Sequence, residues 1–240
     1  MPVLRSSPAS PFGRKAKIAA AVLGLSDRIT VEMTDLNDPN DTIRKQNPLG
    51  KIPALVLDDG KVLYDSRVIV EYLDHLAGGG KVLPQGPSRF DVLTLQALAN
   101  GIMDASILQV YEARYRPEER RDLDWLAYQA DKVRRGLAAL EATPPATMAD
   151  GEIPDAGQIA LACALGYLDL RFEGTWRTEH PRLVAWLAAF EAAEAIDDAQ
   201  RAIAIAPTYA KAHHRLRTAL ERMDRPRDAE SCRGQACALS

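Results

Sequence analysis

Three short polar stretches in the N-terminal third of the chain carry side chains suited to bind an anion or a peptide. The first, Ser7-Pro-Ala-Ser10, directly precedes an amphipathic helix predicted to begin at Pro11, with Ser10 as its N-cap. A serine there lies beside main-chain amides that lack intrahelical partners, where the helix dipole favours an anion. Because a hydroxyl is a poor nucleophile without a nearby base, Ser10 is expected either to donate to a substrate anion or simply to cap the helix.

The second stretch, Asn47-Pro-Leu-Gly-Lys51-Ile52-Pro53, precedes an apolar run. A proline at the start of a strand cannot donate to the ladder, and a cis Ile52–Pro53 bond in a tight turn costs only about 0.5–1 kcal/mol. Such a turn would leave the preceding main-chain groups able to bind an extended peptide as an added strand. A trans proline on an edge strand is the alternative.

The third stretch is Asp65-Ser66, which opens a helix directly after a strand. The Ser66 hydroxyl and the amides at the helix N-terminus could bind a carboxylate, and Asp65 could accept from an ammonium group. Together they match the two charges of an α-amino acid. Taken alone, the dipeptide is also a routine helix start.

The elements expected to position these residues alternate between strand and helix. From Val3 the order is β-α-β-(α)-β-β-α, with a half-buried strand at residues 29–33, a hairpin around Asp59-Gly60 and a helix that ends at residues 78–80. This order predicts a small mixed sheet with helices on its faces. The strand pattern is absent after residue 86, where the expected helices cover residues 88–115, 117–141, 155–171 and 181–193.

The start of the third of these helices, Asp155-Ala-Gly-Gln158, resembles a capping box, but a generic helix start is the favoured interpretation. After residue 193 the pattern changes, and its alanine spacing followed by His213-x-x-Leu216 resembles the junction of two tetratricopeptide repeats. A pair of alanine-rich helices with chance spacing is the alternative. The expected domains are therefore 1–80, 86–193 and a tetratricopeptide-like helical tail at 194–240.

Composition excludes several classes of protein. Hydrophobic residues make up 47% and charged residues 26% of the 240 positions, which excludes a disordered or fibrous chain. The 30 basic and 33 acidic residues give a net charge of -3, which argues against nucleic-acid binding. No apolar run is long enough to span a membrane, and the opening residues lack a signal-peptide core. The three cysteines are too few for a disulfide framework, so the chain is expected to be cytoplasmic. They also lack metal-ligand spacing, so no bound metal is expected.

Taken together and in this order, the three stretches and the helical second half resemble the cytosolic glutathione transferases of the serine type. The run Leu63-Tyr-Asp-Ser-x-x-Ile-x-x-Tyr-Leu73 strengthens the likeness, which covers about residues 1–192. The resemblance implies an α+β thioredoxin-like domain with a mixed four-stranded sheet, followed by an all-α domain. The tail would add an extra C-terminal helical hairpin.

The resemblance also implies a role for each stretch. Ser10, or Ser7 if the alignment shifts, would stabilise the glutathione thiolate. The remaining glutathione-binding residues would be Lys51 at a carboxylate, Ile52 and cis-Pro53 at the cysteinyl part, and Asp65 and Ser66 at the γ-glutamyl end. No cysteine precedes Cys163, which disfavours thiol-disulfide chemistry.

The implied activity is attack by the glutathione thiolate, as co-substrate, on a small hydrophobic electrophile in a homodimer. Candidates for the electrophile pocket share one helix face, and ordinary core packing is their alternative role; they are Met103, Ile107, Tyr111 and Tyr115. A glutathione-binding or protein-interaction module with little turnover, using the tail to bind a protein partner, is the competing hypothesis.

Overall fold

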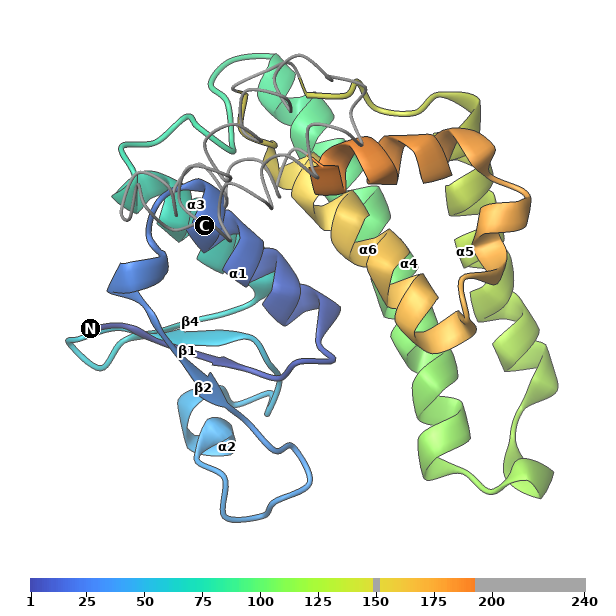
Figure 1. Ribbon diagram of the computed structural model, residues 1–240. Helices are drawn as coiled ribbons and strands as arrows, with labels where there is room; N and C mark the ends of the chain where they lie inside the picture. Colours follow the sequence, from blue (N-terminus) through green and yellow to red (C-terminus); the bar gives the residue numbers. More distant parts are fainter. Residues whose placement is uncertain (149–151, 193–240) are drawn as a thin grey trace, which may run out of the picture. The chain divides into compact units, whose positions relative to one another are not determined.

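The N-terminal part of the protein is built on a mixed sheet of four strands, as expected from the sequence (Figure 1). The computed structural model describes residues 1–148 and 152–192, so the predicted tail at 194–240 lies outside the described residues. The sheet order is β2-β1-β3-β4, with β1 parallel to β2 and antiparallel to β3. The strands are β1 (Val3–Ser6), β2 (Thr30–Met33), β3 (Ala54–Val56) and β4 (Val62–Leu63).

Strand register brings the three polar stretches to one end of this sheet. Arg5 pairs with Ala54, so the last residues of β1 lie beside the turn that precedes β3. Leu63 pairs with Leu55, so β4 also ends beside the start of β3. Because β1 leads into the first stretch and β4 leads into the third, all three are neighbours although they are far apart in the sequence.

Two helices, α1 (Pro11–Val22) and α3 (Ser66–Leu76), follow β1 and β4 and pack against each other. Apolar side chains from the sheet and from these helices form the core of this part of the protein. Its most deeply buried members include Leu4, Ala16, Ala19, Leu55, Ile69, Val70 and Leu73. The short helix α2 (Ile43–Gln46) corresponds to the bracketed helix between the second and third strands of the expected order.

The expectation of a half-buried strand at residues 29–33 was wrong. All four residues of β2 are exposed, and only Ile29, just before the strand, is buried. β2 is an edge strand, so one of its sides lacks a neighbouring strand, and its side chains lie outside the core. Alternating residue types therefore predicted the strand correctly and its burial incorrectly.

The second half of the sequence is helical and consists mainly of α4 (Ser88–Tyr115), α5 (Leu123–Ala142) and α6 (Ala156–Phe172). A helix was expected from residue 117, but residues Glu118–Arg120 form a 3-10 turn before α5 begins; two further 3-10 turns occupy Ser26–Arg28 and Thr175–Thr178. α6 packs against both α4 and α1, which explains why it is buried on nearly every side.

Residues 1–142 and 153–178 form one compact unit, and the described residues of 143–152 and 179–192 belong to a second. In the second unit residues 181–192 are helical, and the Trp186 indole donates to the Ala146 carbonyl at 3.4 Å. No helix in the described ranges is both long and apolar enough to cross a membrane.

The capping box expected at the start of α6 is present. Asp155 Oδ1 accepts from the amides of Gly157 and Gln158, both at 2.8 Å, and Gln158 Oε1 accepts from the Asp155 amide at 2.9 Å. These bonds satisfy main-chain donors that a helix start leaves without partners.

Asp155→Ala should lower the free energy of unfolding by about 0.5–2 kcal/mol, because the orphan amides lose their acceptor. Asp155→Ser, which keeps an acceptor at the same place, should recover most of that loss. Urea denaturation of the two variants measures the difference. Equal destabilisation by alanine and serine would show that the cap itself contributes little.

Candidate functional site

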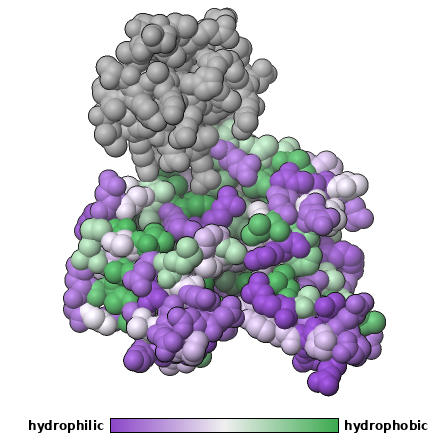
Figure 2. Space-filling view, turned by 60° about the horizontal axis from the view of Figure 1, so that its bottom comes forward, coloured by the Kyte–Doolittle hydropathy of each residue, from purple (hydrophilic) through white to green (hydrophobic). Residues whose placement is uncertain are grey.

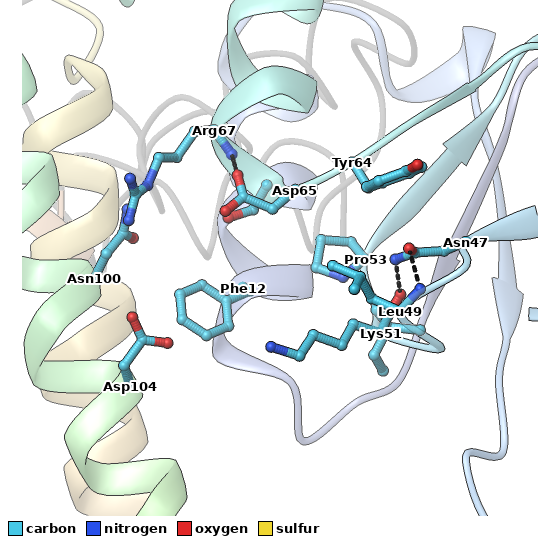
Figure 3. A pocket seen from close by; sticks show the side chains of 12 residues that line it. Phe12, Asn47, Leu49, Lys51, Pro53, Tyr64, Asp65, Arg67, Asn100 and Asp104 are labelled. Atoms are coloured by element: carbon cyan, nitrogen blue, oxygen red, sulfur yellow. Dashed lines mark hydrogen bonds between the residues drawn. The ribbon is translucent and has the colours of Figure 1, made fainter. Parts of the chain in front are cut away.

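A pocket opens at the shared end of the sheet, between the turn before β3, the start of α3 and one face of α4 (Figure 3). Asn100 and Asp104, one turn apart on α4, lie on one side of the pocket, and Lys51 and Pro53 lie on the other. The full lining consists of Phe12, Asn47, Leu49, Lys51, Ile52, Pro53, Tyr64, Asp65, Ser66, Arg67, Asn100 and Asp104.

Five of the seven residues expected at a binding site line this one pocket, and they come from the second and third polar stretches. They are Lys51, Ile52, Pro53, Asp65 and Ser66. Ser7 and Ser10 are not part of the lining, but Phe12, two residues after Ser10, is. The first stretch is therefore next to the pocket rather than on its wall.

Ser10 is the N-cap of α1, as expected, and Pro11 occupies the first helical position. Its Oγ accepts a hydrogen bond from the Gly13 amide at 3.0 Å. A serine hydroxyl also carries one donor hydrogen, so this bond leaves Ser10 able to donate to an anion. The Ser7 carbonyl accepts from the Ser10 amide at 3.2 Å, which fixes the turn between the two serines.

The Ile52–Pro53 bond is cis, which decides between the two alternatives that the sequence left open. Asn47 holds this turn: its Nδ2 donates to the Lys51 carbonyl at 2.8 Å and its Oδ1 accepts from the Leu49 amide at 3.0 Å (Figure 3). Within the described part of the chain, no hydrogen bond involves the main-chain N–H or C=O of Ile52. Ile52 can therefore pair with an extended peptide.

Asp65 caps α3, with Oδ1 accepting from the Arg67 amide at 2.8 Å. The carboxylate is exposed, whereas Ser66 is buried, with 2% of its surface exposed. The Arg67 side chain extends from α3 toward Asn100 on α4 (Figure 3). The bond between Tyr64 and Asp65 is also cis. An exposed carboxylate and a helix N-terminus thus face the same pocket.

A fully buried lysine lies behind the pocket. Lys15 Nζ donates to Asn100 Oδ1 at 3.1 Å, and burial lowers the pKa of Lys15 to about 8, against the opposing attraction of Asp65. Burial likewise raises the pKa of Asp104 above its ordinary value, although Arg67 and Lys51 oppose the rise. The site therefore combines cations and carboxylates from three helices and the turn before β3.

Sequence reasoning missed two kinds of pocket residue. Asn47 and Tyr64 lie inside the motifs that were recognised, and only their own roles went unassigned. Asn100 and Asp104 share a helix face by their i, i+4 spacing, but nothing local in the sequence shows that this face meets the sheet. In the ranges that the structure describes, no group of three or more His, Cys, Asp or Glu side chains could hold a metal ion.

Comparison with known proteins identifies the family. The family model for the N-terminal domain of glutathione S-transferase matches residues 9–76, and the model for the C-terminal domain matches residues 108–189. An uncharacterised GST-like protein of Escherichia coli K12, YibF, is 34% identical over 181 residues, which are 73% of this chain and 86% of YibF. The chain belongs to the glutathione S-transferase family.

Solved structures of glutathione transferases extend this likeness to the fold. A family member from Pseudomonas fluorescens Pf-5, determined with bound glutathione, is 45% identical, with a TM-score of 0.72 over 80% of this chain and 93% of that one. A glutathione S-transferase from Methylobacillus flagellatus KT, also with glutathione bound, is 39% identical, with a TM-score of 0.71 over 79% and 94% of the two chains. The expected thioredoxin-like sheet followed by a helical domain is confirmed.

The buried Lys15 predicts how the stability of this family member depends on pH. Its pKa rises from about 8 to its ordinary 10.5 on unfolding, so between these values the unfolded chain binds more protons than the folded one. Relative to Lys15→Met, the wild type should therefore gain stability as the pH rises through that window, by up to about 3 kcal/mol.

Urea denaturation across this pH range measures the gain, with Lys17→Met, a partly exposed lysine of the same helix, as the matched control. If the free energies of unfolding of wild type and Lys15→Met differ by the same amount across this pH range, Lys15 is not titrating between these pH values.

Proposed function

We propose that the protein is a serine-type glutathione transferase that activates the glutathione thiolate for attack on a small electrophile. One observation carries the proposal: a turn with unpaired main-chain groups at Ile52 and the helix start at Asp65-Ser66 line one pocket, directly beside the N-terminus of α1. The glutathione bound to the solved relatives supports the choice of ligand.

The chemistry of the pocket suggests an orientation for the tripeptide. The γ-glutamyl end would place its ammonium group at the exposed Asp65 carboxylate and its carboxylate at the N-terminus of α3, next to Ser66. The cysteinyl residue would pair with the Ile52 main chain in the manner of an added strand. Lys51 would then reach the glycyl carboxylate. This orientation directs the sulfur toward α1.

A hydrogen bond from Ser10, together with the N-terminus of α1, contributes enough free energy to lower the thiol pKa as far as activation requires. A free thiol titrates near 8.5, and lowering that pKa by about two units requires roughly 2.7 kcal/mol of preference for the anion. One hydrogen bond to a charged group contributes about 1.5–3 kcal/mol, and a helix N-terminus about 0.3–1 kcal/mol. A donor hydroxyl at the start of α1 therefore needs no metal ion and no general base.

In the proposed step, the thiol proton passes to solvent and the sulfur lone pair forms a bond to an electrophilic carbon. Where that carbon carries a leaving group, the carbon–leaving-group bond breaks and its electron pair departs with the leaving group. Ser10 donates to the sulfur before the attack, and the nucleophile therefore exists as thiolate at neutral pH.

A homodimer remains part of the proposal by family resemblance. Large apolar side chains lie exposed on both halves of the first unit, with Leu49 67% exposed and Phe90 70% exposed. Sedimentation equilibrium decides the assembly state.

The competing proposal is a glutathione-binding module with little turnover, whose residues 194–240 bind a protein partner. It is favoured by the absence of Ser7 and Ser10 from the pocket lining. Retention on immobilised glutathione, followed by a conjugation assay with and without residues 194–240, separates the two proposals. Retention without conjugation in either form supports the binding module, and full activity after truncation makes the tail dispensable for catalysis.

Ser10→Ala should raise the pKa of the enzyme-bound glutathione thiol by about one to two units, because the thiolate loses one charge-assisted hydrogen bond. Glutathione affinity should change only a few-fold, since the other contacts are unaffected. The thiolate absorbance of the complex, followed against pH, measures the shift.

Ser7→Ala is the matched control and should leave the thiol pKa unchanged. A shift in Ser7→Ala but not in Ser10→Ala would assign the role to Ser7 instead. Because Ser10 also caps α1, a thermal melt of each variant checks that the helix remains folded.

A further inference from the structure

Two tyrosines and two arginines from α4 and α6 form a cluster outside the pocket, and no step proposed above uses it. We call Tyr111, Arg114, Tyr167 and Arg171 the tyrosine–arginine cluster. The Arg114 guanidinium carbon lies 5.9 Å from the centre of the Tyr111 ring, and that of Arg171 lies 5.9 Å from the centre of the Tyr167 ring. α4 and α6 pack against each other, and Tyr111 and Arg114 lie close enough to Tyr167 to affect its pKa, so the two pairs are neighbours.

The cluster lies along the same helix face as the pocket. On α4, Tyr111 follows Asp104 by seven residues, or nearly two full turns, which places it on the same face about 10 Å further along the axis. The part of α4 that carries Tyr111 and Arg114 is its C-terminal end, at the bottom of Figure 1. Figure 2, in which the bottom of Figure 1 comes forward, shows hydrophilic and hydrophobic side chains intermixed on this face of the molecule.

Arg14 of α1 extends the cluster toward the glutathione pocket. A Cβ at Gly166 would lie only 2.5 Å from the terminal nitrogen of Arg14, so this guanidinium rests on α6 directly beside Gly166. Gly166 precedes Tyr167, and Arg14 lies two residues after Phe12 of the pocket lining. The cluster is therefore adjacent to the end of α1 where the thiolate is expected.

Arg14, Arg114 and Arg171 belong to no ion pair in the described part of the chain, although Arg14 is close enough to Asp169 to help lower the pKa of that carboxyl. Asp169, the carboxylate closest to them in sequence on α6, is already held by the Arg177 guanidinium at 2.6 Å and the Trp176 indole at 2.9 Å.

The donors of the cluster suit an anion with two oxygens. Arg171 Nε is buried without a hydrogen-bond acceptor among the described residues. Burial raises the pKa of Tyr167, and Arg171 and Arg114 oppose the rise. The Tyr167 hydroxyl accepts a hydrogen bond from Arg171 and keeps its own donor hydrogen at neutral pH. Guanidinium groups bind carboxylates through paired hydrogen bonds, and tyrosine hydroxyls add further donors.

We infer that the tyrosine–arginine cluster binds a carboxylate on the second substrate and thereby selects acidic electrophiles. This inference rests on the proposed transferase function. It revises the expectation of a purely hydrophobic electrophile.

Of the residues considered for the electrophile pocket, Met103 is fully buried and packs in the core, whereas Tyr111 and Tyr115 are 38% and 61% exposed. Their rings lie 5.4 Å apart, edge to face.

A matched pair of electrophiles tests the inference on the full-length protein. The probes are para-chlorodinitrobenzoate, with nitro groups flanking the chlorine, and its uncharged methyl ester. In both, the thiolate sulfur bonds to the carbon that bears chlorine, chloride leaves with the bonding electron pair, and the thiol proton goes to solvent. The ratio of kcat/KM for the acid to that for the ester, corrected for the uncatalysed rates, isolates recognition of the carboxylate.

The wild type should prefer the acid, and Arg171→Gln should lower kcat/KM for the acid about tenfold or more while changing that for the ester less than about threefold. Arg114→Gln should act in the same direction, and Arg171→Lys should recover part of the loss because it keeps the charge. Arg134→Gln, which removes an exposed arginine ion-paired with Asp131 on α5, is the matched control and should leave the ratio unchanged.

A wild type that conjugates the ester but shows no preference for the acid overturns this inference and leaves the proposed function standing. An equal loss with both probes in Arg171→Gln also overturns it, because the role of Arg171 would then be structural. If neither probe is conjugated and glutathione is not retained, the proposed function fails, and this inference fails with it.

Discussion

The first main-chain N–H groups of an α-helix have no partner inside the helix, and in this protein two helices begin at the same end of one sheet. α1 and α3 follow directly from β1 and β4, and the order β2-β1-β3-β4 brings both helix starts next to the turn before β3. A site with unpaired amides and two positive helix ends attracts an anion before any side chain contributes. Every part of the proposed glutathione site depends on this convergence.

Side chains then give that general attraction its specificity. Ser10 and Asp65 each cap a helix through one acceptor oxygen, which leaves a hydroxyl hydrogen on Ser10 and an exposed carboxylate at Asp65. A zwitterionic amino-acid end fits Asp65 and the start of α3, and a thiolate fits Ser10 and the start of α1. The buried Lys15, bonded to Asn100, joins α1 to the face of α4 that forms the opposite wall.

Local signals predicted much of this arrangement. The caps at Ser10, Asp65 and Asp155 follow from the residue types that satisfy orphan amides, and such signals act within a few residues. The positions of Asn100 and Asp104 could not be predicted in the same way, because their contribution depends on how α4 packs against the other elements. The exposure of β2 was mispredicted for a related reason, since residue alternation indicates a strand but not whether it lies at the edge of the sheet.

The most direct test is a crystal structure of the protein with glutathione. We predict that the sulfur lies within hydrogen-bond distance of Ser10 Oγ, with the cysteinyl main chain paired to Ile52 and the ammonium group at Asp65. A sulfur bonded to Ser7, or a tripeptide bound away from the start of α1, would contradict it.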